Sequence, residues 1–457
     1  MSKTGHSAMA KLRSIDKIVR SAPDTLILDI GTLHTKLGFD GDSAPRFIIP
    51  TRIHGRGLER DKILKIFPYK PSSEPNSARE LELALYDMFS DLFYNHYQIN
   101  PREYRVLILE SVFNPSPLKE SIAKCLFLSY QVHSILFFPH SIACLHSVGQ
   151  EEGLVIDIGH TGTRITPISC SIVLLSLCRD IPGFGGEYML NWLRFNLSKQ
   201  ASLVKVGTLE RVDKKVEDVL TQEFLEDVRC RMCAVRCIDE TRTPPDAHLN
   251  VPTDPSLLLC VPGELRHRVA ECLFSIYPEE IDGFPLDLLP ERTLSQEIAE
   301  CFLKLPIDLR VPLSGNIVLA GGPTMLPGFK KRIMEEINLI FSKEHEGKLG
   351  SKVVFSIHMP IIHENILGWH GGSVVGACTQ AFDARALKRE QFVKKGWKVP
   401  DWCQLDPTDR PKLDYSRTST NPQSSYSSRP GLRGMDPSQH KPATKDSISA
   451  FFNKLIT

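Results

Sequence analysis

Two segments of the chain share one pattern of hydrophobic and polar residues. Residues 26–32 read LILDIGT and residues 154–160 read LVIDIGH. A continuous run of leucine and β-branched residues predicts a strand covered on both faces, and the Asp-x-Gly at its end predicts a turn. A second strand is expected after each turn, over residues 35–39 and 163–168. The repeat indicates an internal duplication.

Helical and strand patterns alternate after the first of these units. Residues 81–97 carry apolar side chains at helical spacing, and residues 106–109 (VLIL) predict a buried strand. A second helix is expected over residues 118–127. This alternation predicts an α/β fold.

A glycine pair separates a strand pattern from a helix pattern later in the chain. Residues 317–320 (IVLA) predict a buried strand, Gly321-Gly322 follow, and a helix is expected over residues 329–340. Glycines at such a place let the backbone approach a ligand closely. The turn is therefore a candidate binding element.

Composition narrows the choice of partners. The 457 residues are 42% hydrophobic, and 55 Lys and Arg oppose 54 Asp and Glu, for a net charge of +1. Such a balance creates no strong field for nucleic acid. The longest apolar run, residues 168–178, contains serines and is shorter than the roughly 20 residues of a membrane helix, so it is expected to form strands. We expect neither nucleic acid binding nor membrane insertion.

Both ends of the chain differ from its middle. Residues 1–22 are basic and polar without the apolar stretch of a signal peptide, which predicts a flexible extension. Residues 404–457 are predicted to form a disordered tail, because residues 406–446 are rich in Ser, Pro, Thr, Asn and Arg. Within the tail, the apolar residues of 448–456 are either a docking peptide or a frayed end.

The 12 cysteines lack the spacing of a disulfide scaffold and indicate buried thiols in a reducing compartment, the cytosol. Cys230, Cys233 and Cys237 would lie on nearly one face of a helix, which raises the possibility of zinc. No fourth ligand stands at a suitable spacing, so packing is the preferred interpretation.

The two Asp-x-Gly turns are suited to phosphate binding if they face each other. Asp29 and Asp157 would then orient a hydrated Mg²⁺, and Gly31 and Gly159 would let backbone N–H groups approach phosphate oxygens. Lys36 would add positive charge. A single such turn is weak evidence, because ordinary hairpins contain it too.

Three stretches make the resemblance to actin specific. They are residues 28–46, residues 100–115 and residues 320–329, which read AGGPTMLPGF. The resemblance covers about residues 25–403. It implies an α/β, actin-like fold of two lobes, with duplicated ribonuclease-H-like domains and a central nucleotide cleft.

The resemblance also implies a domain plan. The first lobe would span residues 23–160, with residues 370–403 returning to it, and would include a shortened second subdomain at about residues 51–80. The second lobe would span residues 161–369, with an inserted subdomain at about residues 200–300.

A structural ligand, ATP or ADP with Mg²⁺, is implied in the cleft. Asp29 and Asp157 would hold the Mg²⁺ through water. The nucleotide-binding residues implied by the resemblance are Asp29, Gly31, Thr32, Lys36, Asp157, Gly159, Thr161, Gly321, Gly322 and Met325.

Several positions depart from the actin pattern. His140 stands where actins carry the glutamine that positions the attacking water. It is either an ordinary residue at a helix start or a substitute base. His160, Thr161 and Arg164 also replace actin residues, so we expect very slow ATP hydrolysis at most, no catalytic residue and no enzyme. Cys230 stands where actins hold the ribose with a glutamate, which weakens the expected sugar contacts.

Within the family, the resemblance is to the actin-related subunit at the pointed end of dynactin. It rests on residues 398–403, residues 306–310 and the short segment after Pro50. It implies a subunit that caps the actin-related filament of dynactin and supports dynein-driven microtubule transport. The implied partners are the filament subunits and other pointed-end subunits, in the cytoplasm and cytoskeleton. The alternatives are a nuclear actin-related subunit of a chromatin remodeller and an active actin-fold ATPase or kinase.

Overall fold

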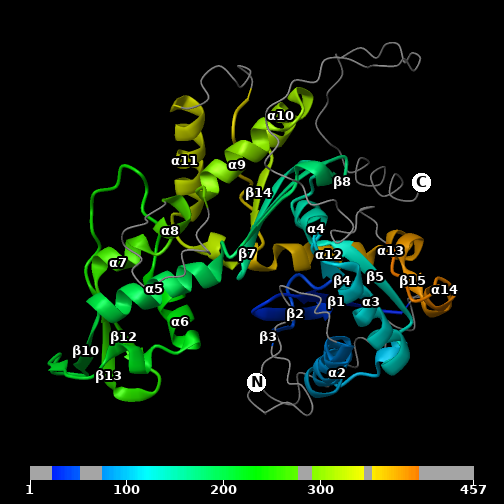
Figure 1. Ribbon diagram of the computed structural model, residues 1–457, viewed down its shortest axis with the longest axis horizontal. Helices are drawn as coiled ribbons and strands as arrows, with labels where there is room; N and C mark the ends of the chain where they lie inside the picture. The colour runs from blue at the N-terminus through cyan, green and yellow to red at the C-terminus, as the bar shows by residue number, and fades with distance from the viewer. Residues whose placement is uncertain (1–22, 52–74, 276–290, 344–352, 401–457) are drawn as a thin grey trace.

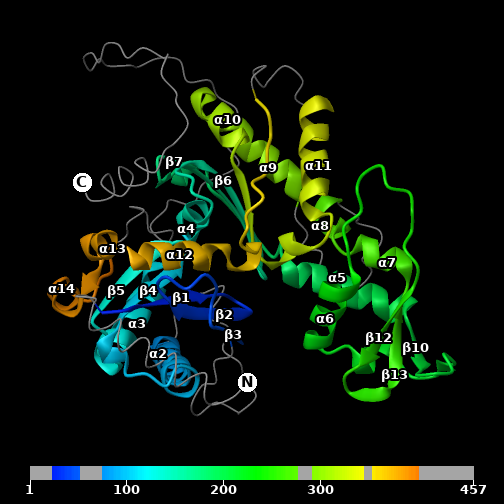
Figure 2. The same cartoon turned by 180° about the vertical axis from the view of Figure 1, so that it is seen from behind.

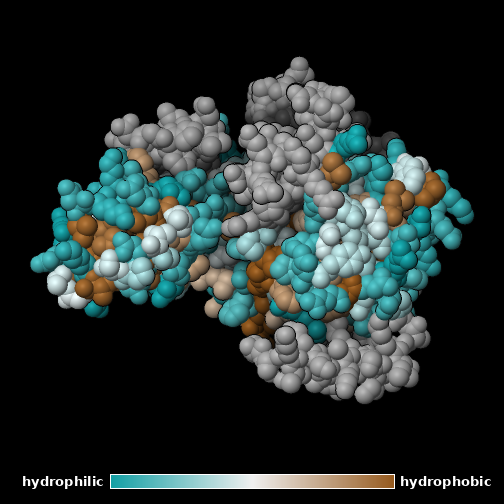
Figure 3. Space-filling view, turned by 90° about the horizontal axis from the view of Figure 1, so that it is seen from below, coloured by the Kyte–Doolittle hydropathy of each residue, from teal (hydrophilic) through white to brown (hydrophobic). Residues whose placement is uncertain are grey.

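The computed structural model describes residues 23–51, 75–275, 291–343 and 353–400. Its strands form one six-stranded sheet, one five-stranded sheet and one four-stranded sheet (Figure 1). Helices cover the sheets and separate them, so the α/β arrangement predicted from the sequence is present. Seen from below, the molecule presents two bulges of largely hydrophilic surface with hydrophobic patches on each (Figure 3).

The first sheet has the strand order β15-β5-β4-β1-β2-β3. Helices α2 (Pro75–Ser90) and α3 (Ser116–Lys124) lie over it, each continued by a short π-helical turn. The antiparallel pairing of β15 with β5 brings the C-terminal chain back to this sheet. The strands are β1 (Thr25–Ile30), β2 (His34–Phe39), β3 (Phe47–Pro50), β4 (Arg105–Glu110), β5 (Ser134–Pro139) and β15 (Leu387–Lys388).

The second sheet repeats the plan of the first. In the first sheet β1 pairs antiparallel with β2 and parallel with β4, and in the second β6 pairs antiparallel with β7 and parallel with β14. The predicted duplication is therefore confirmed. The strands are β6 (Gly153–Ile158), β7 (Gly162–Ser169), β8 (Ile172–Val173), β9 (Arg179–Pro182) and β14 (Ile317–Ala320).

The third sheet, of order β11-β10-β13-β12, lies with helices α5 to α8 on one side of the molecule (Figure 1). Its strands are β10 (Ser202–Lys205), β11 (Arg211–Val212), β12 (Ala247–Val251) and β13 (Asp254–Val261). The helices are α5 (Gly186–Gln200), α6 (Gln222–Met232), α7 (Gly263–Arg268), α8 (Glu271–Phe274), α9 (Leu294–Leu303), α10 (Ile307–Ser314) and α11 (Phe329–Lys343).

Helices α4 (His140–Ser147) and α12 (Leu367–Ala377) pack against each other between the first two sheets (Figure 2). One hydrophobic cluster joins side chains of both sheets to these helices. The helices approach so closely that a Cβ on Gly371 would lie 1.8 Å from the Ala143 carbonyl oxygen. Helices α13 (Thr379–Arg385) and α14 (Arg389–Lys394) follow α12.

Trp369 anchors α12 to the first sheet. Its side chain is fully buried, and its Nε1 donates a hydrogen bond to the Ile27 carbonyl oxygen at 3.2 Å. A Cβ on Gly38 of β2 would lie 2.3 Å from Cζ2 of the Trp369 ring. The indole therefore occupies space that only a glycine at position 38 leaves free.

Two sequence predictions need correction. The run of residues 168–178 was expected to be strand throughout, but after β8 it forms a 3₁₀ turn over Leu175–Leu177. The three cysteines do not share a helix face, because α6 ends at Met232. Cys230 is exposed, whereas Cys233 is buried and burial raises its pKa to about 12.

Some predictions lie outside the described residues. They are the extension 1–22, residues 52–74 of the expected second subdomain, and the whole region after residue 400, including the predicted tail of residues 404–457. The lobe boundaries stay predictions. Among the helices that the structure describes, none combines the length and the apolar character needed to cross a membrane.

We predict that Gly371→Ala destabilises the protein by about 3 kcal/mol. The new methyl group would overlap the backbone of Ala143, which cannot shift without moving the whole of α4. Gly315→Ala is the control, since its Cβ would find no atom closer than 3.9 Å. Denaturant unfolding measures both. Equal stability of the two variants would contradict the close approach of α4 and α12.

Candidate nucleotide-binding cleft

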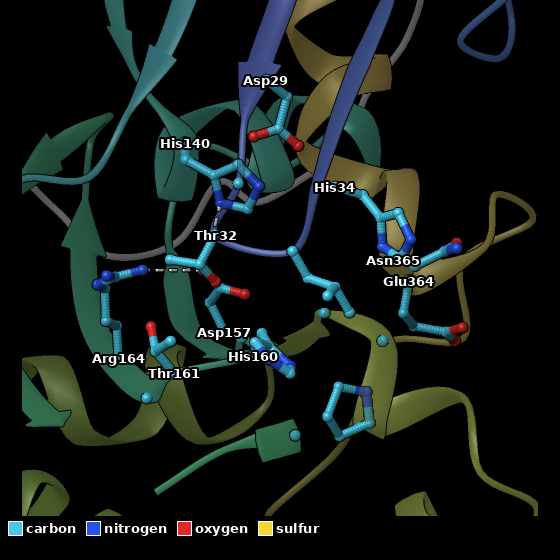
Figure 4. Close-up of a pocket in the computed structure, with 18 of the residues that line it drawn as sticks. Asp29, Thr32, His34, His140, Asp157, His160, Thr161, Arg164, Glu364 and Asn365 are labelled. Atoms are coloured by element: carbon cyan, nitrogen blue, oxygen red, sulfur yellow. Dashed lines mark ion pairs between the residues drawn. The ribbon is translucent and has the colours of Figure 1, made fainter. Parts of the chain in front are cut away.

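A cavity of about 460 Å³ opens where β1, β6 and β14 end. This volume is within the roughly 300–1,000 Å³ of small-molecule sites. Every residue predicted for the nucleotide site lines it, together with His140 (Figure 4). They are Asp29, Gly31, Thr32, Lys36, Asp157, Gly159, Thr161, Gly321, Gly322 and Met325.

The two Asp-x-Gly turns have the same backbone hydrogen bond. Gly31 N–H donates to the His34 carbonyl at 3.1 Å, and Gly159 N–H donates to the Gly162 carbonyl at 2.9 Å. A side chain at either glycine would meet the carbonyl that closes its turn. The turns are therefore tight, and they confront each other across one cavity.

The duplication extends to the charges. Asp29 is paired in register with Lys36 across β1 and β2, and Asp157 is paired in the same way with Arg164 across β6 and β7. Directly opposite residues of a β-ladder lie close enough for opposite charges to interact. Each acidic turn thus carries its own cation on the neighbouring strand.

The Asp29–Lys36 pair is the tighter of the two, with 2.6 Å between Lys36 Nζ and Asp29 Oδ2. Burial favours the uncharged form of each group, but their mutual attraction outweighs it. The pKa of Asp29 is consequently lowered from its ordinary value and that of Lys36 is raised. Both groups are charged at neutral pH.

Asp157 is approached by an imidazole ring and a guanidinium group. Its Oδ2 lies 3.7 Å from His140 Nδ1 and 3.9 Å from Arg164 Nη1. Figure 4 shows these groups together on one side of the cavity. Arg164 also lies 3.4 Å from Asp180, whose pKa is raised because burial outweighs this attraction.

His140 is the first residue of α4, as the sequence suggested, but no side-chain capping bond is formed there. Its ring contacts Cys144 Sγ at 3.7 Å and packs on Gly368, where a Cβ would lie 2.1 Å from Nε2. Burial and Asp157 raise the pKa of Cys144 well above its ordinary value. The thiol is therefore protonated and is no nucleophile.

The first glycine of the pair, Gly321, has the geometry that a close backbone approach requires. Gly321 has φ +98°, and a Cβ there would lie 2.0 Å from the Ile158 carbonyl oxygen. The Gly321 N–H donates to the Glu364 carbonyl, and Thr324 Oγ1 donates to the Gly321 carbonyl at 2.8 Å. Only glycine fits at this position, which holds the turn beside the end of β6.

Several cavity residues were not predicted. Glu226 and Arg229 reach the cavity from α6, and His34, Glu364 and Asn365 line it as well. Burial and the charges of Lys36 and Arg229 lower the pKa of His34. Glu226 lies one helical turn before Cys230, a position already singled out, so the helical period could have revealed it.

The donors fit a nucleotide with a hydrated Mg²⁺. The ion pairs described above use Oδ2 of Asp29 and Oδ2 of Asp157, and an ion held through its waters needs no direct protein ligand. Among the residues that the structure describes, no three His, Cys, Asp or Glu side chains form a metal-holding group.

The sequence model of the actin family matches residues 83–402, so the chain belongs to the actin family. The predicted α/β, actin-like fold of two lobes is confirmed. The chain is an actin-related protein, 25% identical over 431 residues to actin-related protein 10 of Dictyostelium discoideum, which covers 83% of this chain and 89% of that protein. Actin-like protein 7A of Bos taurus is 24% identical over 392 residues and covers 81% of each chain. Actin-like protein 7B of Homo sapiens is 22% identical over 414 residues, covering 86% and 90%.

We predict that Lys36→Met destabilises the protein by about 3–5 kcal/mol, because it leaves the buried Asp29 carboxylate without its cation. The double variant Asp29→Asn/Lys36→Met should lose less than the two single losses combined. Since the pKa of Asp29 is held below 3.8, the pair's contribution is present above that pH and is lost as pH falls through the lowered pKa. The loss of stability caused by Lys36→Met should therefore become smaller at acid pH.

Urea unfolding of the wild type, the two single variants and the double variant at several pH values checks these expectations. Lys205→Met, at an exposed position on β10, is the control and should change stability by less than about 0.5 kcal/mol. Additive losses in the double variant would show that the two charges do not interact.

Proposed function

We propose that this protein is a structural subunit that caps the pointed end of the actin-related filament of dynactin and supports dynein-driven transport. The observation that carries the proposal is the contrast inside the cleft. All the positions expected to contact the nucleotide line one cavity, and so does His140, which the resemblance to actin puts at the water-positioning place. A protein that keeps the pocket and loses the chemistry is suited to assembly.

In this proposal the nucleotide, ATP or ADP with Mg²⁺, stabilises the fold. Asp29 and Asp157 hold the hydrated ion, Lys36 neutralises phosphate charge, and Gly31 and Gly159 bring the backbone to the phosphates. A bound Mg²⁺ would supply positive charge that offsets the negative charge of the phosphates. A ligand at about a thousand times its Kd adds about 4 kcal/mol of stability.

Hydrolysis has little support in the cleft. Asp157 Oδ2 and the His140 ring face each other at 3.7 Å, and Arg164 approaches the same carboxylate oxygen. These contacts engage the side chains that would otherwise orient a water molecule. We infer that ATP remains intact long enough to act as a fixed part of the structure.

The place in dynactin rests on the family, on the similarity to actin-related protein 10, and on the sequence features near residues 306–310 and 398–403. The proposed partners are filament subunits and the other pointed-end subunits, in the cytoplasm and cytoskeleton. In actin the second subdomain engages the neighbouring subunit. A subunit with a shortened second subdomain would therefore not bind a further subunit there, and the filament would stop at it. A chromatin-remodelling subunit and an active ATPase or kinase remain the alternatives.

We predict that the affinity-tagged full-length protein co-purifies with dynactin subunits and is seen at one filament end by electron microscopy. Recovery with chromatin-remodelling subunits, or without any dynactin component, would refute the proposal. Self-assembly of the purified protein into long filaments would refute the capping role.

We predict that His140→Gln increases single-turnover ATP hydrolysis by on the order of tenfold to a hundredfold, since a positioned group contributes typically 10²- to 10⁴-fold. His133→Gln, an exposed residue outside the cavity, is the matched control and should have no effect. If the wild-type protein hydrolyses ATP readily and His140→Gln abolishes it, His140 is a base and the structural role of the nucleotide is wrong.

A further inference from the structure

Helix α2 and the π-helical turn that continues it (Asp91–His96) carry apolar side chains on both faces (Figure 1). The outer face carries Leu83, Tyr86 and Tyr94, which are 41%, 38% and 52% exposed. Leu128, 37% exposed, adds to them from the turn Cys125–Ser129, and we call these residues the α2 surface. The inner face packs into the core of the first sheet through Ala84, Leu85, Met88, Phe89, Leu92 and Phe93.

The buried Tyr130 connects the parts of the α2 surface. Its ring stacks on the Tyr86 ring with 5.4 Å between centroids, and it lies 6.3 Å from the Tyr94 ring. Its hydroxyl donates a hydrogen bond to the Tyr86 carbonyl oxygen at 2.5 Å. The turn that carries Leu128 precedes Tyr130 and contacts α2. Exposed apolar side chains gathered in one place mark an interaction site, whereas single ones need no explanation.

The charged residues of this region are mostly acidic. Along α2 and its π-helical turn, Glu82, Asp87 and Asp91 outnumber the single arginine, Arg79. Lys124 of α3 pairs with Glu82 at 2.6 Å and offsets its charge. Asp87 and Asp91 therefore leave net negative charge beside the exposed apolar side chains. A segment that is both basic and amphipathic is complementary to such a surface.

Residues 8–20 of this chain have that character. Their larger apolar residues recur at spacings of three and four, which is the pattern of one helix face. A helix of this length is marginal in water alone, so it would form on docking. The apolar residues are Leu12, Ile15, Ile18 and Val19, and the cations Lys11, Arg13, Lys17 and Arg20 oppose the single acidic residue Asp16.

The segment joins the described chain near the α2 surface. Asp24 accepts a hydrogen bond from the Arg105 N–H at 3.1 Å, and β1 begins at the next residue. The start of β1 pairs with the end of β2, where the Phe39 ring lies 5.1 Å from the Tyr97 ring. Tyr97 follows the π-helical turn, three residues after Tyr94. About three residues of extended chain cover the roughly 10 Å diameter of a helix, so the link before Asp24 is long enough.

We propose that residues 8–20 form a helix that docks on the α2 surface of the same molecule. Leu12, Ile15 and Val19 pack on the exposed tyrosines and leucines, and the basic residues lie beside the acidic ones of α2. Because the segment is tethered, its effective concentration is on the order of millimolar, so a weak contact holds it in place. The segment then belongs to the folded body, in contrast to the flexible extension that composition predicts.

The test introduces the photo-crosslinking amino acid p-benzoylphenylalanine in place of Tyr94 in the full-length protein, and mass spectrometry maps the crosslinked peptides. Irradiation should join position 94 to residues 8–20, with a yield independent of protein concentration from about 0.1 to 5 µM. The same amino acid in place of Ile172, an exposed residue of β8, is the control and should not reach the extension. Crosslinks from position 94 to the C-terminal tail, or crosslinked dimers, would overturn the proposal.

Charge reversal in the segment provides a second measurement. Lys11→Glu/Arg13→Glu/Lys17→Glu should lower the crosslink yield about fivefold, because like charges then meet on docking. Lys441→Glu/Lys445→Glu makes the same kind of change in the C-terminal tail and should leave the yield unchanged. An unchanged yield in the triple variant would contradict the docking.

A membrane surface is the competing partner for a basic amphipathic segment. Sedimentation of the full-length protein with vesicles of phosphatidylcholine and about 30% phosphatidylserine tests it. Vesicle binding that is lost on deletion of residues 2–20, without any crosslink at position 94, would assign the segment to a membrane and refute its docking on α2. Thermal unfolding shows that the protein with p-benzoylphenylalanine at position 94 is folded.

Discussion

The close contact between α4 and α12 holds the two duplicated sheets at a fixed separation. Gly371 brings the backbone of α12 against the carbonyl of Ala143, and one hydrophobic cluster extends from this contact into both sheets. Because β1 and β6 end on opposite sides of the same space, their Asp-x-Gly turns confront each other. The cavity exists only while this spacing is kept.

The charged residues of the cleft repeat in the two sheets in the same way as the strands do. Asp29 has Lys36 opposite it on the next strand, and Asp157 has Arg164. The first pair is tight and mostly buried, whereas the second is looser and shares its arginine with Asp180. The acidic residues therefore do not repel a polyphosphate as unpaired carboxylates would.

The sequence predicted the parts of the cleft that depend on local pattern. Both acidic turns and the glycine pair follow buried strands, and the pattern of apolar residues along the sequence predicts such strands. Glu226 and Arg229 were missed, although the helical period places Glu226 one turn before Cys230. The pairing of His140 with Asp157 could not be predicted from local pattern, because it joins the ends of two distant elements.

Two predictions of secondary structure were wrong, each for a local reason. The three cysteines suggested a shared helix face, but spacing alone does not reveal that α6 stops at Met232. The run of residues 168–178 has strand composition, yet the chain turns after β8 into a 3₁₀ turn. Apolar composition identifies buried segments better than it identifies where they end.

The fit between Gly38 and Trp369 ties two positions far apart in the chain to one another. The indole fills the space that a side chain on Gly38 would need, and it is also hydrogen-bonded to β1. Neither residue can change size alone without expelling the other from the core. Across relatives of this chain, the two positions should therefore covary, with bulk gained at one matched by bulk lost at its counterpart.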